Sequence, residues 1–125
     1  MRQFSYVLLV ILAFASCSKP GTGGRSRINV FVMRDTEKSL IQDMQVYIKY
    51  GATTSPGTEA GDYNDSEITN HHGKCSFKGL RRGNYFFYTE GFDSLYQDSV
   101  SGEGFLEIDN KSGERNLVIY TLPIQ

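Results

Sequence analysis

Residues 71–92, HHGKCSFKGLRRGNYFFYTEGF, decide the fold. Residues 74–78 alternate polar and apolar side chains, which is the period of a half-buried strand. Gly83 suits the connecting turn, because glycine takes positive φ without a Cβ clash. The aromatic-rich residues 84–90 are typical of a packed strand. We therefore expect two strands joined by a short turn, with the rest of the chain laid against them as further strands.

The composition indicates one domain with a hydrophobic core. The chain has 125 residues, of which 39% are hydrophobic and 13% aromatic, and this length is typical of a single domain. The formal net charge is −1. Binding of nucleic acid needs a dense positive surface, so we expect no nucleic-acid partner.

The N-terminus has the layout of a bacterial export signal. Arg2 is followed by an apolar run at residues 6–15, YVLLVILAFA, which is shorter than the roughly 20 residues that span a bilayer. The end of this run, Phe14-Ala15-Ser16-Cys17, resembles a lipobox. That resemblance implies that Cys17 becomes the first mature residue and carries acyl chains such as palmitate. Plain secretion and an uncleaved anchor are the alternatives.

These features predict three regions. Residues 1–16 form a lipoprotein signal peptide, residues 17–26 a flexible tether rich in Gly, Pro and Ser, and residues 27–125 a β-domain. The membrane is then a partner through the lipid anchor. The predicted location is the cell envelope, at the outer membrane.

The remaining segments are expected to be strands separated by turns. No segment shows sustained apolar spacing of the helical kind, and residues 51–65 form the longest turn-rich loop. Short strands with frequent turns favour an all-β fold, a single antiparallel sandwich of about seven strands. The further strand candidates are 28–33, 44–50, 67–69, 95–100, 104–108 and 115–122.

Three motifs carry a resemblance to a known family. Residues 40–48 (LIQDMQVYI), 69–77 (TNHHGKCSF) and 80–85 (LRRGNY) resemble the carboxypeptidase regulatory-like family, whose members are transthyretin-like (prealbumin-like) sandwiches. The resemblance implies a Greek-key β-sandwich in a Bacteroidetes-type lipoprotein. It also implies that Tyr85 and Phe87 pack between the sheets beside Phe77 and Cys75. A fold of this kind does not define a function.

The sequence holds no constellation that indicates catalysis or a cofactor. His71 and His72 are the only histidines, and adjacent strand residues point to opposite faces, so we predict no metal centre. Residues 62–67 begin like a calcium loop but lack its later ligands. Cys75 is expected to be a small buried hydrophobe. We predict that the protein is not an enzyme and that it has no cofactor.

Tyrosines are the candidate ligand or partner residues. Tyr47, Tyr63 and Tyr88 are the selected positions, because tyrosine offers contact area at low entropic cost; ordinary packing is the alternative. The leading hypothesis is a non-catalytic, lipid-anchored module for protein interaction or assembly, with an outer-membrane protein as its partner. The alternative is a carbohydrate-binding surface lipoprotein whose tyrosines stack on sugar rings.

Overall fold

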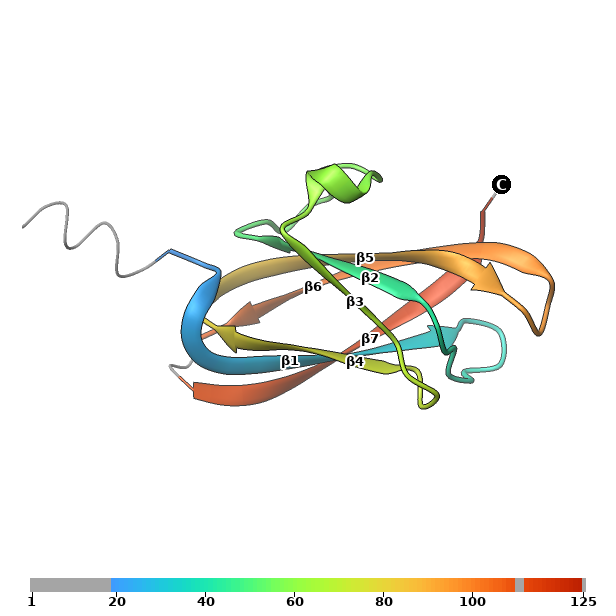
Figure 1. Ribbon diagram of the computed structural model, residues 1–125, viewed down its shortest axis with the longest axis horizontal. Helices are drawn as coiled ribbons and strands as arrows, with labels where there is room; N and C mark the ends of the chain where they lie inside the picture. Colours follow the sequence, from blue (N-terminus) through green and yellow to red (C-terminus); the bar gives the residue numbers. More distant parts are fainter. Residues whose placement is uncertain (1–18, 110–111, 125) are drawn as a thin grey trace, which may run out of the picture.

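The structure, a computed structural model, describes residues 19–109 and 112–124 (Figure 1). The predicted signal peptide and Cys17 lie outside the described residues. Within them, no helix is long and apolar enough to cross a membrane. The elements are β1 (Thr22–Arg34), β2 (Gln45–Tyr50), the short 3-10 helix η1 (Ala60–Asp62), β3 (Asp65–Ile68), β4 (Lys74–Leu80), β5 (Gly83–Asp93), β6 (Asp98–Ile108) and β7 (Ser112–Pro123).

The seven strands form a single sheet in the order β3-β2-β5-β6-β7-β1-β4. The sheet curls until its edge strands β3 and β4 contact each other, which nearly closes a barrel. The all-β prediction is confirmed. The expectation of a fully antiparallel arrangement is wrong, because β1 and β7 pair in parallel over ten residue pairs, from Arg25↔Ser112 to Arg34↔Thr121. Alternation of side chains is the same in parallel and antiparallel strands, so it could not reveal this.

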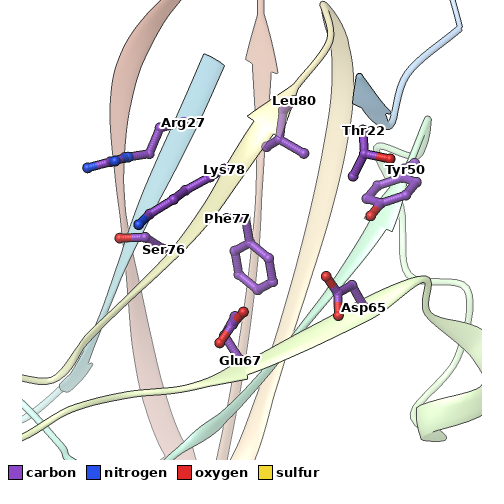
Figure 2. A pocket seen from close by; sticks show the side chains of 9 residues that line it. All are labelled: Thr22, Arg27, Tyr50, Asp65, Glu67, Ser76, Phe77, Lys78 and Leu80. Atoms are coloured by element: carbon purple, nitrogen blue, oxygen red, sulfur yellow. The ribbon is translucent and has the colours of Figure 1, made fainter. Parts of the chain in front are cut away.

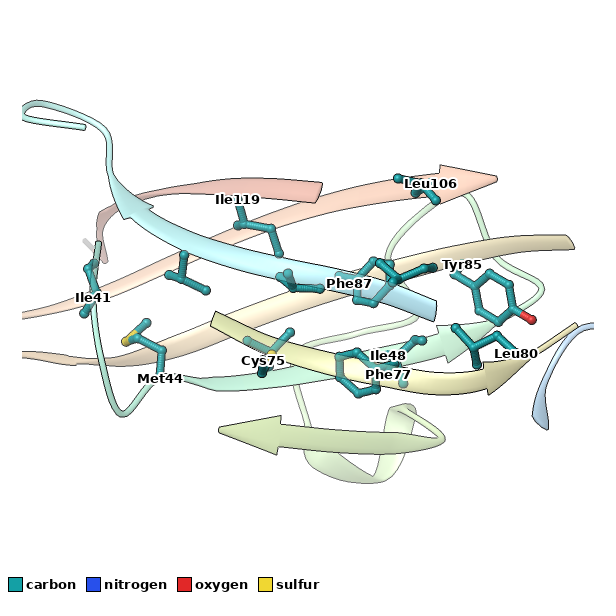
Figure 3. Packing of buried hydrophobic residues seen from close by; sticks show 14 of the residues in the cluster. Ile41, Met44, Ile48, Cys75, Phe77, Leu80, Tyr85, Phe87, Leu106 and Ile119 are labelled. Carbon is teal, nitrogen blue, oxygen red and sulfur yellow. The ribbon is translucent and has the colours of Figure 1, made fainter. Parts of the chain in front are cut away.

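The core lies inside the curled sheet and confirms the central packing prediction (Figure 3). Tyr85 and Phe87 of β5 are fully buried there, in one cluster with Phe77 and Cys75 of β4. The rings of Phe77 and Phe87 lie 5.6 Å apart. Each large apolar side chain removed from water contributes about 1.5–3 kcal/mol, so this cluster accounts for much of the stability. The other members of the cluster have aliphatic or thioether side chains: Ile28, Val30, Val32, Ile41, Met44, Val46, Ile48, Leu80, Val100, Leu106, Ile108 and Ile119.

The first strand begins earlier than expected. Residues 22–26, predicted to be part of a flexible tether, form the start of β1. The chain is held just before this point: the Gly21 N–H donates to the Tyr85 hydroxyl at 3.0 Å, and the Arg81 N–H donates to the Gly21 carbonyl oxygen at 2.8 Å. The predicted domain boundary at residue 27 is therefore too late.

Two glycines that resemble strand breakers lie inside long strands. β5 continues through Gly91, and β6 through Gly102, so the separate strands expected at 95–100 and 104–108 are one strand preceded by a turn at residues 94–97. A Cβ on Gly102 would lie 2.5 Å from the Tyr120 carbonyl oxygen. This glycine allows β7 to approach closely, which is a common reason for glycine in a strand.

Candidate ligand-binding cleft

The three predicted tyrosines come together on the outer face of the sheet. Tyr47 of β2 lies opposite Tyr88 of β5 in the antiparallel register, and Tyr63 reaches over from the long loop. The ring centroids are 5.6 Å apart for Tyr47–Tyr63, 6.0 Å for Tyr63–Tyr88 and 6.3 Å for Tyr47–Tyr88. We call these residues the tyrosine cluster.

Most of the contacts of the tyrosine cluster are internal. Tyr88 is only 8% exposed, and its hydroxyl donates to Glu90 Oε2 at 2.8 Å. Burial and then the neighbouring carboxylate raise the pKa of Tyr88. The Tyr63 hydroxyl donates to the Gly57 carbonyl oxygen at 2.8 Å. The cluster thus holds residues 51–64 against the sheet; this leaves Tyr88 little surface for a ligand, whereas Tyr47 and Tyr63 stay partly exposed.

The end of the same loop places β3. The Asn64 side-chain oxygen accepts a hydrogen bond from the Tyr50 N–H at 2.8 Å, and the Asn64 N–H donates to the Ile48 carbonyl oxygen at 2.9 Å. Since Asp65 is the next residue, these bonds determine where β3 begins. The tyrosine cluster is therefore connected to β3 through one residue.

β3 and β4 are consecutive, but they do not form a paired hairpin. Their turn is closed by hydrogen bonds from the Gly73 N–H to the Asn70 carbonyl oxygen and from the Asn70 N–H to the Lys74 carbonyl oxygen, each 2.9 Å. Beyond the turn, β3 pairs with β2, whereas β4 pairs with β1. The two strands therefore diverge, and they leave a cleft of about 500 Å³ between the edges of the sheet (Figure 2).

The cleft has carboxylates on one side and cations on the other. Asp65 and Glu67 come from β3, and Arg27 and Lys78 come from β1 and β4. Within the described residues, no ion pair joins the two sides. Such an arrangement can accept and donate hydrogen bonds at once.

The base of the cleft is apolar and its wide end is aromatic. Phe77 and Leu80 are buried beneath the charged side chains, and Tyr50 stands beside Asp65. Burial, and then the Asp65 charge, raise the pKa of Tyr50, so its hydroxyl is protonated at neutral pH. The volume lies in the range of small-molecule sites, which combine apolar surface with a few convergent polar groups.

The other candidate residues have structural explanations. The rings of His71 and His72 contact each other in the exposed β3–β4 turn, with centroids 4.0 Å apart and planes tilted by 43°. Residues 19–109 and 112–124 contain no group of three or more His, Cys, Asp or Glu side chains that could hold a metal ion. Cys75 is a buried free thiol whose pKa is raised to about 12, mainly by burial. Its predicted role as a packing residue is confirmed.

Sequence reasoning missed the four charged residues of the cleft. Asp65 and Glu67 are two positions apart on a short strand, so both point to one side. That signal was available, but it resembles an ordinary solvated strand face. Arg27 directly precedes the strand expected at residues 28–33, and no local pattern indicates its neighbour. Only the tertiary arrangement brings it next to Lys78.

No protein-family model matches the chain, and no curated protein matches it. Among solved structures, the chain is similar to a Pseudomonas aeruginosa protein described as a "putative carbohydrate binding protein". The TM-score is 0.50 at 11% sequence identity, and the alignment covers 84% of this chain and 93% of that one. At this identity the likeness shows a shared fold alone.

Proposed function

We propose that the protein is a non-catalytic carbohydrate-binding module whose ligand lies in the cleft between β3 and β4. The observation that carries the proposal is the set of unpaired charged side chains on both sides of this cleft. Sugar hydroxyls both donate and accept hydrogen bonds. They would donate to Asp65 and Glu67 and accept from Arg27 and Lys78, while Tyr50 supplies an aromatic surface at the wide end.

The similar fold of the Pseudomonas protein, whose description names carbohydrate binding, supports the same class of ligand. The alternative sequence-based hypothesis, a carbohydrate-binding surface lipoprotein, therefore becomes the preferred one. Its site differs from the expected one: the cleft takes the ligand, and the tyrosine cluster positions β3. Tyr47 and Tyr63 act on the ligand through the loop that ends at Asn64.

The envelope location is part of this proposal. A lipid on Cys17 would anchor the chain close to Thr22, the first residue of β1, and Thr22 lines the cleft. Five extended residues span at most about 18 Å. The cleft of an anchored molecule would thus lie near the membrane surface.

The family assignment is also kept as a proposal. It rests on the motifs at 40–48, 69–77 and 80–85, and the last two form the β3–β4 turn, most of β4 and the start of β5. These motifs surround the cleft and the Tyr85 core. We propose on this basis that the curled sheet is a variant of the prealbumin-like, Greek-key sandwich of carboxypeptidase regulatory-like domains.

Isothermal titration of the purified full-length protein with soluble polysaccharides tests the carbohydrate proposal. We expect binding to at least one polysaccharide, and a loss of tenfold or more in affinity, about 1.4 kcal/mol, in the Asp65→Asn/Glu67→Gln double variant. Asp98→Asn is the matched control, because Asp98 is an exposed carboxylate at the β5–β6 turn. Equal affinity of the double variant and the control would contradict the proposal.

A second candidate function, protein docking, is favoured by the outer face of β1 and β7. Phe31 pairs with Val118 and Met33 pairs with Tyr120. Val118 and Tyr120 are 40% and 46% exposed, so the four side chains form an apolar surface. Such surfaces are typical of protein interaction sites.

The docking candidate is tested by cross-linking the full-length lipidated protein in its native envelope. We expect one stoichiometric membrane protein to be captured, and capture to be lost in Val118→Asp. Asp65→Asn/Glu67→Gln should leave capture unchanged, because these residues lie in the cleft. Capture that survives Val118→Asp would exclude this surface.

A further inference from the structure

The cleft places two cations next to each other. Ile28 of β1 pairs with Phe77 of β4, and the residues that adjoin this pair, Arg27 and Lys78, lie side by side at the edge of the cleft (Figure 2). Like charges on neighbouring strands repel and destabilise a sheet. Lys78 is exposed and Arg27 is partly exposed, so both charges are accessible to a ligand in the cleft.

No side chain of the described chain neutralises this pair. The ion pairs found in residues 19–109 and 112–124 are Arg34–Asp93 and Lys38–Asp35. The side chains of Arg27 and Lys78 form no hydrogen bond or ion pair with a described residue. Asp65 and Glu67 face them across the cleft without reaching them. The positive potential of the pair is thus directed at whatever occupies the cleft.

A ligand that fits has negative charge on one side and hydroxyl groups on the other. Arginine binds carboxylate and sulfate groups with two parallel hydrogen bonds, and lysine adds a point charge. Hydroxyl donors satisfy Asp65 and Glu67 without a further charge. A neutral sugar would bring no counter-charge to the cation pair. A simple anion would bring no hydroxyl donor to Glu67 or to Asp65, whose Oδ1 accepts from the Ser66 N–H at 2.8 Å.

We propose that the ligand is an acidic glycan, whose carboxylate or sulfate group binds between Arg27 and Lys78 while its hydroxyls donate to Asp65 and Glu67. This inference rests on the proposed carbohydrate-binding function, and it specifies the class of sugar. Affinity for the acidic glycan falls as the salt concentration rises, because the ion pairs formed at a cleft edge are screened.

The test uses neutral and acidic polysaccharides with related backbones. The full-length protein is titrated with galactan and polygalacturonate, and with dextran and dextran sulfate. We expect the acidic member of at least one pair to bind at least about tenfold more tightly than its neutral counterpart. Arg27→Gln and Lys78→Gln should each reduce the affinity for the acidic member by a larger factor than the affinity for any neutral member, because only the acidic member loses an ion pair.

Lys38→Gln is the control for loss of one positive charge, because Lys38 is exposed and lies outside the cleft. Thermal unfolding of each variant checks that the sheet is retained. Equal or tighter binding of the neutral members would overturn the acidic-glycan inference while the carbohydrate function stands. Equal affinity of Lys38→Gln, Arg27→Gln and Lys78→Gln for the acidic polysaccharide would overturn the acidic-glycan inference as well. Absence of binding to all four polysaccharides would count against both the inference and the proposed function.

Discussion

Arg34 and Asp93 form a doubly hydrogen-bonded ion pair between the end of β1 and the end of β5. Arg34 Nε lies 2.6 Å from Asp93 Oδ2, and Arg34 Nη2 lies 2.7 Å from Asp93 Oδ1. The Asp93 side chain is 2% exposed and that of Arg34 13%. This pair ties together strands that are not neighbours in the sheet, at the end of the molecule opposite Thr22.

We predict that Asp93→Asn destabilises the protein by about 3 kcal/mol, since removal of one partner leaves a largely buried charge uncompensated. Urea unfolding measures the change. The control is Asp35→Asn, which breaks the exposed Lys38–Asp35 pair and should cost less than about 1 kcal/mol. Similar losses in both variants would show that burial of the Arg34–Asp93 pair has no energetic consequence.

The same pair predicts a pH dependence. The hydrogen bond from Arg34 is the main cause of the lowered pKa of Asp93. A carboxyl whose folded pKa is depressed stabilises the protein fully above its unfolded pKa, about 3.9, and the contribution is lost as the pH falls through the folded pKa. The stability gap between wild type and Asp93→Asn should be constant above about pH 5 and should shrink in more acidic solution. Thermal unfolding at stepped pH values measures this gap, and a gap of constant size down to pH 2 would contradict the assignment.

The Tyr85 hydroxyl should be required for order at the start of β1. It donates to the Arg81 carbonyl oxygen at 2.6 Å and accepts from the Gly21 N–H. Tyr85→Phe keeps the buried ring but leaves these groups unpaired, at a cost of about 1–3 kcal/mol. Tyr85→Ala also removes the ring and should cost about 3–5 kcal/mol. Hydrogen exchange should show faster exchange at Gly21 in Tyr85→Phe; unchanged protection there would disprove the role of the hydroxyl.

Tyr63 should hold the long loop and, through Asn64, the start of β3. We expect Tyr63→Ala to expose residues 51–64 to limited proteolysis, because the variant loses two ring contacts and the bond to Gly57. Tyr63→Phe keeps the rings and is the matched control, with much smaller sensitivity. If both variants resist the protease as wild type does, the tyrosine cluster does not hold the loop.

The Cys75 thiol should be inert in the folded protein. Its pKa of about 12 and its burial leave almost no accessible thiolate at pH 8, and the thiolate is the reactive form. Alkylation by iodoacetamide should be about a hundredfold or more slower in buffer than in urea. Equal rates in the two solutions would mean that β4 opens readily.

The alternating and aromatic segments allowed the all-β class and the central core positions to be predicted. The core positions of Phe77, Tyr85 and Phe87 follow from side-chain alternation, which depends on local geometry only. The parallel pairing of β1 with β7 joins the two ends of the chain, and no local pattern records it. Gly91 and Gly102 resemble strand breaks in the sequence. In the fold, each glycine makes room for a neighbour that approaches closely in space, and local sequence does not reveal that neighbour.

The candidate site was predictable only in part. The sequence indicated Tyr47, Tyr63 and Tyr88, and the structure brings these together. It did not indicate the cleft, since two strands joined by a short turn ordinarily pair as a hairpin. Here β3 and β4 pair with strands on opposite sides of the core. That divergence is a property of the whole sheet, and it creates the opening.

Mapping of a bound sugar onto the chain shows whether the ligand lies between β3 and β4. Amide chemical shifts of the labelled protein would be followed while oligosaccharides from a binding polysaccharide are added. We expect the largest changes on both sides of the cleft, at residues 65–67 of β3 and 76–78 of β4. Changes confined to the outer face of β1 and β7, or to the tyrosine cluster, would contradict a binding site between β3 and β4.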